Sequence, residues 1–444
     1  MIYSLFKRMI QPALRRLTLF AFIILSAHPS LSAQSSEKHY LIKAGQLYDA
    51  EQNAFLKNQQ ILIKGNRIVK VGEKLEVPPN TQVFNYPNAT VTPGLIDAHT
   101  HVLTSQGITE ELAADAILRS SEHRVLRAVK HLKSYLAAGF TTIRDVGNSG
   151  QYLDIELRQA LERGDIEGPR MFVSGPIIGS MDGQLTSGFP LRKFDHIARS
   201  EQSLISGVEE ASKAVKEHIA RGVDLIKILA IGNSLTLSLE EMKAIVQTAH
   251  AHRLKVTAHC DRDWAAHAAI QAGVDGIEHA YGFKQATLDT MAQKGIYVVP
   301  TYGSVAGMVY YRKLAKQDYK LEDLQQEFAA SWGKWVLAIR KAGLLMVAGS
   351  DAYYNLGVER GDWAKQTLRG YSDAGLSPED VLQSATSNAA KILSRTGELG
   401  TLKVNAVADL VVFDGDLKQN FSQALFDVAL VMKQGRIEFQ KSQP

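Results

Sequence analysis

The sequence predicts an α/β protein, a (β/α)8 TIM barrel of residues 93–396 accompanied by a small β-sandwich domain that residues 34–92 and 397–444 form together. Two patterns lead to this prediction. Through the middle of the chain, eight apolar, β-rich runs alternate with amphipathic segments of helical length, and eight parallel βα units close a TIM barrel. At both ends, short strand-like segments are separated by Gly and Asn turns.

The first 33 residues differ from the rest of the chain. Four basic residues between positions 7 and 16 precede an apolar run from Leu17 to Ala27, and a short polar tract follows up to Ala33. This order is typical of a secretory signal peptide, so we expect residues 1–33 to be removed and the mature protein to be secreted or periplasmic. A retained membrane anchor is the alternative, although the run is too short for a stable membrane span.

The charge of the mature chain gives no reason to expect a nucleic-acid or anionic-membrane partner. The sequence has 50 Lys and Arg against 46 Asp and Glu, and residues 1–33 carry four of the basic residues and no acidic one. A neutral mature chain without a clustered basic face gives no reason to expect nucleic-acid binding. Cys260 is the only cysteine, which excludes an intramolecular disulfide. The sequence does not determine the oligomeric state, so a homo-oligomer remains an alternative.

The predicted elements follow one another in a regular order. Residues 40–49, 59–72 and 81–93 alternate apolar and polar side chains, and residues 408–417 and 428–440 repeat this texture near the other end. The eight barrel runs are 94–102, 141–146, 170–178, 224–230, 255–260, 276–280, 297–302 and 344–351. One intervening helix starts at Ser238, which forms a capping box with Glu241.

Side chains that can bind metals end several of the predicted strands. His99 and His101 are two residues apart at the end of the first strand, so they point to the same side. His259 and His279 end the fifth and sixth strands, and Asp351 ends the eighth. Each alone could be an ordinary polar residue. Together they favour a metal site, because barrel enzymes build their active sites at the carboxyl ends of the strands.

Lys227 lies inside the fourth predicted strand, on the same face as Leu225 and Leu229. A buried ammonium group must be paired, neutralised or chemically altered. A salt bridge to a carboxylate on a neighbouring strand is the plain alternative to a functional role.

The sequence resembles the amidohydrolase superfamily, specifically its imidazolonepropionase-like branch with the Xaa-Pro and Xaa-Arg dipeptidases, over the whole mature chain. The motifs that carry the resemblance are TPGLIDAHTHV at 92–102, AGFTTIRDVG at 138–147, GVDLIKI at 222–228, AGVDGIEHA at 272–280, AGSDA at 348–352, ATSNAAKIL at 385–393 and GELGTLKVNAVADLVVFDGD at 397–416.

The resemblance implies two divalent metal ions per chain, with zinc as the expected metal. The implied ligands are His99, His101, Lys227, His259, His279 and Asp351. Lys227, as an N-carboxylated lysine, would bridge the ions. A hydroxide that bridges them would attack an amide carbonyl, and Asp351 would be the catalytic residue that carries the proton to the leaving amine. Asp97 and Glu278 could orient neighbouring imidazoles or pair with a barrel arginine such as Arg144.

The loops that would contact the substrate depart from the dipeptidase pattern. Gln184 stands in a loop that lacks the usual histidine, the loop 231–236 is short, and Cys260-Asp261 replaces a second histidine. No partner pattern for a nucleophile accompanies Cys260, which favours a small loop residue.

We expect a small amide or peptide substrate, such as a dipeptide or an N-acyl amino acid. Tyr302, Tyr353 and Arg360 are the predicted substrate-binding residues, and Tyr354 and Arg192 lie in similar positions. One alternative is a mononuclear cyclic-amide hydrolase or deaminase of the same superfamily, in which Lys227 is structural. The other is a non-catalytic secreted binding protein, which would be expected to have lost one or more of the ligands.

Overall fold

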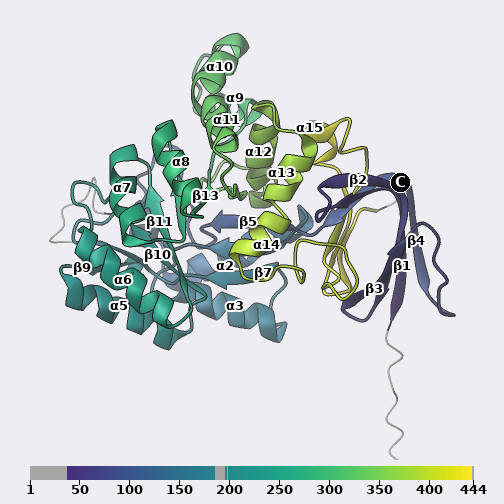
Figure 1. Ribbon diagram of the computed structural model, residues 1–444, viewed down its shortest axis with the longest axis horizontal. Coiled ribbons are helices and arrows are strands. Elements are labelled where there is room, and N and C mark those ends of the chain that lie inside the picture. The colour runs from purple at the N-terminus through teal and green to yellow at the C-terminus, as the bar shows by residue number, and fades with distance from the viewer. Residues whose placement is uncertain (1–37, 186–195, 198, 443–444) are drawn as a thin grey trace, which may run out of the picture. The chain divides into compact units, whose positions relative to one another are not determined.

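Both ends of the chain pair in one sheet. The structure, a computed structural model, describes residues 38–185, 196–197 and 199–442, so the predicted signal peptide 1–33 and Arg192 lie outside the described residues. A seven-stranded sheet runs in the order β16-β15-β14-β4-β1-β2-β3 (Figure 1). Its strands are β1 (His39–Asp49), β2 (Ala54–Lys64), β3 (Arg67–Gly72), β4 (Gln82–Pro93), β14 (Leu410–Phe413), β15 (Val428–Lys433) and β16 (Arg436–Gln440).

The antiparallel pairing of β4 with β14 joins the two ends, from Thr90 opposite Phe413 to Pro93 opposite Leu410. The alternating pattern buries residues such as Ile42, Ile61 and Val412 in a common core. The pairing of both chain ends therefore agrees with the prediction. The strand order is continuous, however, so a sandwich of two separate sheets is not confirmed.

The middle of the chain alternates parallel strands with helices. A three-stranded sheet contains β5 (Leu95–Thr100), β6 (Phe140–Asp145) and β7 (Arg170–Val173). A six-stranded sheet has the order β13-β12-β11-β10-β8-β9. Its strands are β8 (Ile177–Ser180), β9 (Gln202–Ile205), β10 (Leu225–Leu229), β11 (Lys255–Cys260), β12 (Gly276–His279) and β13 (Tyr297–Val299).

Helices follow most of these strands along the chain, and the last of the helices lies between β14 and β15 of the seven-stranded sheet. They are α1 (Ala114–Leu118), α2 (Ser121–Ala137), α3 (Leu153–Arg163), α5 (Val208–Arg221), α6 (Leu239–Ala251), α7 (Asp263–Ala272), α8 (Gln285–Gln293), α9 (Val305–Leu314), α10 (Leu321–Phe328), the π-helical turn η1 (Ala329–Gly333), α11 (Lys334–Lys341), α12 (Arg360–Asp373), α13 (Pro378–Ser384), α14 (Ser387–Ile392) and α15 (Phe421–Ala424). Helices α5, α6 and α7 pack in sequence beside β10 and β11 (Figure 1). The predicted capping box of Ser238 and Glu241 is confirmed at the start of α6. Within the described residues, no helix is long and apolar enough to cross a membrane.

Two of the eight predicted barrel strands differ in the structure. The third run is divided into β7 and β8, and residues 344–351 make an isolated bridge at Met346 without forming a longer strand. The residues of this run still form backbone hydrogen bonds with β13 and β5. Val347 N donates to Val298 O (2.9 Å), and Ala98 N donates to Ala348 O (2.9 Å). The two parallel sheets are also linked between β7 and β10, because Asp224 N, just before β10, donates to Val173 O at the end of β7 (2.8 Å).

The parallel register brings the carboxyl ends of neighbouring strands to one edge. Leu229 on β10 pairs with His259 on β11, and Cys260 pairs with His279 on β12. Side chains at these strand ends can therefore meet, as expected for parallel βα units.

Candidate metal centre

Two histidines of β5 and one carboxylate meet at the carboxyl edge of the parallel strands. His99 Nε2 lies 3.2 Å from His101 Nε2. Asp351 Oδ1 lies 3.6 Å from His99 Nε2 and 3.4 Å from His101 Nε2. His279 joins them, because its Nδ1 lies 3.8 Å from Asp351 Oδ2, and ligand atoms of His99, His279 and Asp351 all lie within 4.8 Å of one another.

Hydrogen bonds on the outer side of each ring determine where its proton lies. His99 Nδ1 is 2.7 Å from a carboxylate oxygen of Glu278, and His101 Nδ1 is 2.7 Å from the carbonyl oxygen of Gly147. Burial lowers the pKa of both histidines, so the rings are neutral at pH 7. Because an ionised carboxylate or a carbonyl only accepts, both protons must be on Nδ1.

Each Nε2 atom consequently presents a lone pair to the other, at only 3.2 Å, beside the carboxylate of Asp351. The two Nε2 lone pairs repel each other unless a cation or a proton donor lies between them. Neutral imidazole and carboxylate are also suitable donors for zinc. The donor set therefore fits a divalent metal ion.

Glu278 orients His99 and is itself held in place. It is fully buried on β12. One carboxylate oxygen accepts from His99, while the other accepts from Arg144 Nη2 (2.6 Å) and from the hydroxyl of Thr257. Burial opposes ionisation, but the charge of Arg144 holds the pKa of Glu278 below its usual value. Both roles considered for Glu278, orienting an imidazole and pairing with Arg144, are therefore present.

Asp97 acts on the main chain. Its Oδ1 accepts from the backbone N–H groups of His99 (3.1 Å) and Ser350 (2.9 Å). Asp97 thereby ties β5 to the segment that carries Asp351. Of the two roles considered for Asp97, neither is supported by a hydrogen bond among the described residues.

The backbone turns sharply at two of the candidate ligands. His279 and Asp351 have φ values of 73° and 51°, and Ala280 follows with 52°. Residues other than glycine seldom adopt this left-handed conformation, and they are often found in it at functional sites. Both side chains thus lie where a strand or run ends and the chain changes direction.

Lys227 and His259 lie in the same neighbourhood. Lys227 is 1% exposed on β10, and burial lowers its pKa despite the carboxylates of Glu278 and Asp351. The ring centroid of His259 lies 4.4 Å from that of His279. Gln184 Nε2 lies 3.1 Å from His259 Nε2, so the residue that replaces the usual histidine reaches a candidate ligand.

Thr301 and Tyr281 were not among the site residues predicted from the sequence. Thr301 Oγ1 lies 2.8 Å from His279 Nδ1 and 2.8 Å from the Tyr281 hydroxyl. Tyr302, which the sequence singled out instead, is 1% exposed and donates to Ala280 O (3.2 Å). Adjacent residues of an extended chain face opposite sides. Thr301 lies near the carboxyl end of the seventh predicted run, directly after Pro300, and that position is the signal that could have identified it.

The other predicted substrate contacts have partners within the protein. The ring centroid of Tyr353 lies 6.1 Å from that of His101, and the Tyr353 ring stacks on Tyr354 at 4.7 Å. Arg360 is buried and donates to the carbonyls of Thr104 (3.1 Å), Tyr353 (3.4 Å) and Ala352. A substrate carboxylate would compete with these carbonyls, so substrate binding by Tyr302, Tyr353 and Arg360 stays a prediction.

Cys260 has the properties of a core residue. It is fully buried, its thiol donates to Arg262 O (3.3 Å), and burial raises its pKa to about 12. A thiol of this pKa is a poor nucleophile at neutral pH.

Comparison with known proteins places these observations in a family. The sequence pattern described as "Amidohydrolase family" matches residues 90–437. The chain belongs to the amidohydrolase family. It is a hydrolase that acts on carbon–nitrogen bonds, and metal ions are generally required in this family.

Three relatives show how far the similarity of this amidohydrolase extends. The ochratoxinase of Aspergillus niger is 24% identical over 88% of this chain and 84% of the relative. The crystal structure of a prolidase complexed with N-methylphosphonate-L-proline is 28% identical, covers 90% of this chain and 99% of its own, and has a TM-score of 0.77. The crystal structure of a Xaa-Pro dipeptidase with methionine in its active site is 25% identical, covers 91% and 100%, and has a TM-score of 0.78. These relatives imply a TIM-barrel-like α/β fold.

Proposed function

We propose that this amidohydrolase hydrolyses the amide bond of a dipeptide or an N-acyl amino acid at a binuclear metal centre. The observation that carries the proposal is the pair of Nε2 lone pairs of His99 and His101, 3.2 Å apart beside Asp351. The names of the prolidase and Xaa-Pro dipeptidase relatives support a substrate in which an amino acid leaves as the amine.

The proposed ligands divide between two ions. His99, His101 and Asp351 would hold one, and His259 and His279 the other. When bound, two divalent ions, with zinc expected, supply Lewis acidity that polarises a carbonyl and acidifies water. The deaminase or cyclic-amide alternative needs one ion only.

Lys227 would bridge the ions as its N-carboxylated form. The neutral amine attacks the carbon of CO2 and loses one proton, which turns a cation into an anion with two donor oxygens. Burial of the Lys227 side chain supports this step, because it lowers the pKa of the amine and so raises the fraction that is neutral near pH 7.

Asp351 is proposed to move the proton. Burial raises the pKa of this carboxyl, so the carboxylate can take a proton near neutral pH and pass it to the leaving amine. Glu278 keeps the His99 proton on Nδ1, and Asp97 fixes the main chain beside Asp351. The protein's own part in catalysis is therefore orientation and proton transfer.

Two further features belong to the proposal. The two parallel sheets would be parts of one (β/α)8 barrel, which is supported by the hydrogen bonds of residues 347–351 to both β13 and β5. The mature enzyme would act outside the cytoplasm, which is supported by the export-like order of residues 1–33.

The test combines metal analysis with a substrate screen. Purified, metal-replete enzyme is expected to contain two ions per chain by mass spectrometry and to cleave members of a panel of dipeptides and N-acyl amino acids. The Lys227→Ala variant should retain one ion or fewer and lose nearly all activity. A variant with two ions and normal turnover would contradict the bridging role. Cleavage restricted to cyclic amides would favour the mononuclear alternative.

A further inference from the structure

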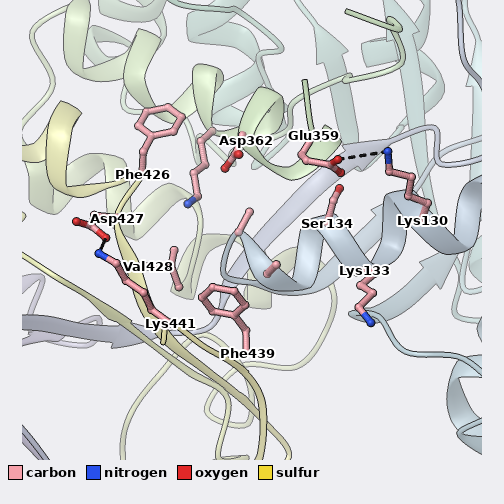
Figure 2. A pocket seen from close by; sticks show the side chains of 13 residues that line it. Lys130, Lys133, Ser134, Glu359, Asp362, Phe426, Asp427, Val428, Phe439 and Lys441 are labelled. Carbon is pink, nitrogen blue, oxygen red and sulfur yellow. Dashed lines mark hydrogen bonds and ion pairs between the residues drawn. The ribbon is translucent and has the colours of Figure 1, made fainter. Parts of the chain in front are cut away.

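A cavity of about 550 Å³ lies away from the candidate metal centre (Figure 2). It is formed where α2 and α12 meet the strands of the C-terminal end, and none of its 13 lining residues is a candidate metal ligand. The volume falls within the range of small-molecule binding sites. The cavity could therefore hold a ligand that is independent of the hydrolytic site.

Lys365 is the unusual residue in the wall of this cavity. Its side chain is 0% exposed, and its Nζ has no hydrogen-bond partner among the described residues. Nζ lies 5.7 Å from the ring centroid of Phe413 and 5.6 Å from that of Phe426. The ring faces attract a cation, but they leave its three N–H donors without an acceptor oxygen. Burial lowers the pKa of Lys365 to about 8, which still leaves it mainly charged at pH 7.

The other cations of the wall already have partners. Three further lysines pair with carboxylates: Lys130 with Glu359 (3.3 Å), Lys133 with Glu167 (3.1 Å) and Lys441 with Asp427 (2.7 Å). Figure 2 shows the first and last of these pairs at the edges of the cavity. Among the lysines that line the cavity, Lys365 is thus the one without a described carboxylate within 4.0 Å.

The remaining wall determines what kind of anion would fit. Phe426, Val428 and Phe439 offer apolar surface. The carboxylates of Glu359, Asp362 and Asp427 lie on the same wall and would repel a ligand with several negative charges. A ligand with one negative charge and an apolar body therefore matches the cavity better than phosphate does.

We propose that this cavity binds a small monocarboxylate with an apolar body, whose carboxylate accepts hydrogen bonds from the Lys365 ammonium group. Because Nζ is buried, the flexible four-carbon stem of Lys365 turns toward the cavity on binding. A charge-assisted hydrogen bond would then satisfy a donor that has no acceptor among the described residues.

Calorimetric titration of the metal-replete enzyme with phenylacetate tests this proposal. One saturable site is expected, and Lys365→Met should weaken its affinity at least tenfold. Lys133→Met is the matched control, because it removes a lysine of the same wall that already has a carboxylate partner, and it should bind phenylacetate as the wild type does. The neutral 2-phenylethanol and the small acetate should each bind at least tenfold more weakly than phenylacetate.

Ala137→Trp provides a second test if Lys365→Met fails to fold. This variant keeps Lys365 but places an indole at the cavity wall, so phenylacetate binding should be lost. Unchanged phenylacetate affinity in Lys365→Met would show that the ligand binds elsewhere, for example at the metal centre. Absence of saturable binding, or phosphate binding at least as tight as that of phenylacetate, would also overturn the proposal. None of these variants touches a candidate metal ligand, so the outcome is independent of the proposed hydrolysis.

Discussion

The Glu278→Gln substitution tests whether the position of one proton controls metal binding. Glu278 accepts from His99 Nδ1 on one oxygen and from Arg144 and Thr257 on the other. A glutamine at this position has only one side-chain oxygen, so it can accept on the His99 side or on the Arg144 side but not on both. Because Arg144 stays protonated, the glutamine oxygen should remain on the Arg144 side and its NH2 should face His99. The His99 proton must then move to Nε2, where it blocks the lone pair that a metal ion needs.

Two separate effects are expected, one on metal affinity and one on the free energy of unfolding. Loss of an orienting partner of a metal-bound histidine costs about 10- to 100-fold in metal affinity, which is about 1.4 to 2.8 kcal/mol. An inverted tautomer should place Glu278→Gln near the upper end of that range. Breaking the buried pair with Arg144 should also lower the free energy of unfolding by about 3 to 5 kcal/mol.

Chelator competition and denaturant unfolding separate the two effects. Asp409→Asn is the matched control, because Asp409 is 3% exposed and pairs with Arg170 (2.8 Å), and neither of these side chains forms a hydrogen bond with a candidate metal ligand among the described residues. That control should lose a similar free energy of unfolding and keep the wild-type metal affinity. If both variants bind zinc as tightly as the wild type, the tautomer argument is wrong.

Three further predictions follow from other contacts. Thr301→Val should weaken metal affinity by about tenfold through the loss of the His279 Nδ1 partner, whereas Thr301→Ser should restore it; equal chelator competition in all three proteins would refute this. Burial lowers the pKa of His131 to about 3, so the unfolded chain takes up a proton below pH 6.5 that the folded chain does not. Stability is therefore lost as pH falls, and His131→Gln should reduce the decrease in unfolding free energy between pH 7 and pH 5 by about 2 kcal/mol, measured by urea unfolding. N-terminal sequencing of protein from the native envelope should begin at or near Gln34, and a retained Met1 would contradict the export prediction.

The sequence was sufficient for the features that depend on local periodicity. The predicted runs that contain His99, His259 and His279 lie on the strands β5, β11 and β12, because apolar, β-branched runs between helical segments fold as parallel strands. The cap at Ser238 was correct because a capping box involves only residues close in sequence. The prediction of a strand at 344–351 was only partly right, because the structure has an isolated bridge at Met346 there and the main chain enters the left-handed region at Asp351.

Only the tertiary structure decided which atoms face a metal ion. His99 and Glu278 are 179 positions apart, and their hydrogen bond depends on the placement of β12 relative to β5, which no local pattern encodes. The same holds for Thr301, whose contact with His279 reflects the side to which the chain turns after Pro300. It also holds for Lys365, because the helical pattern around this lysine does not show whether its side chain meets water or two phenylalanine rings. Sequence periodicity thus predicted the helices and strands. Packing between distant elements determined which ring nitrogen carries a proton, which side chains form hydrogen bonds and where the cavity lies.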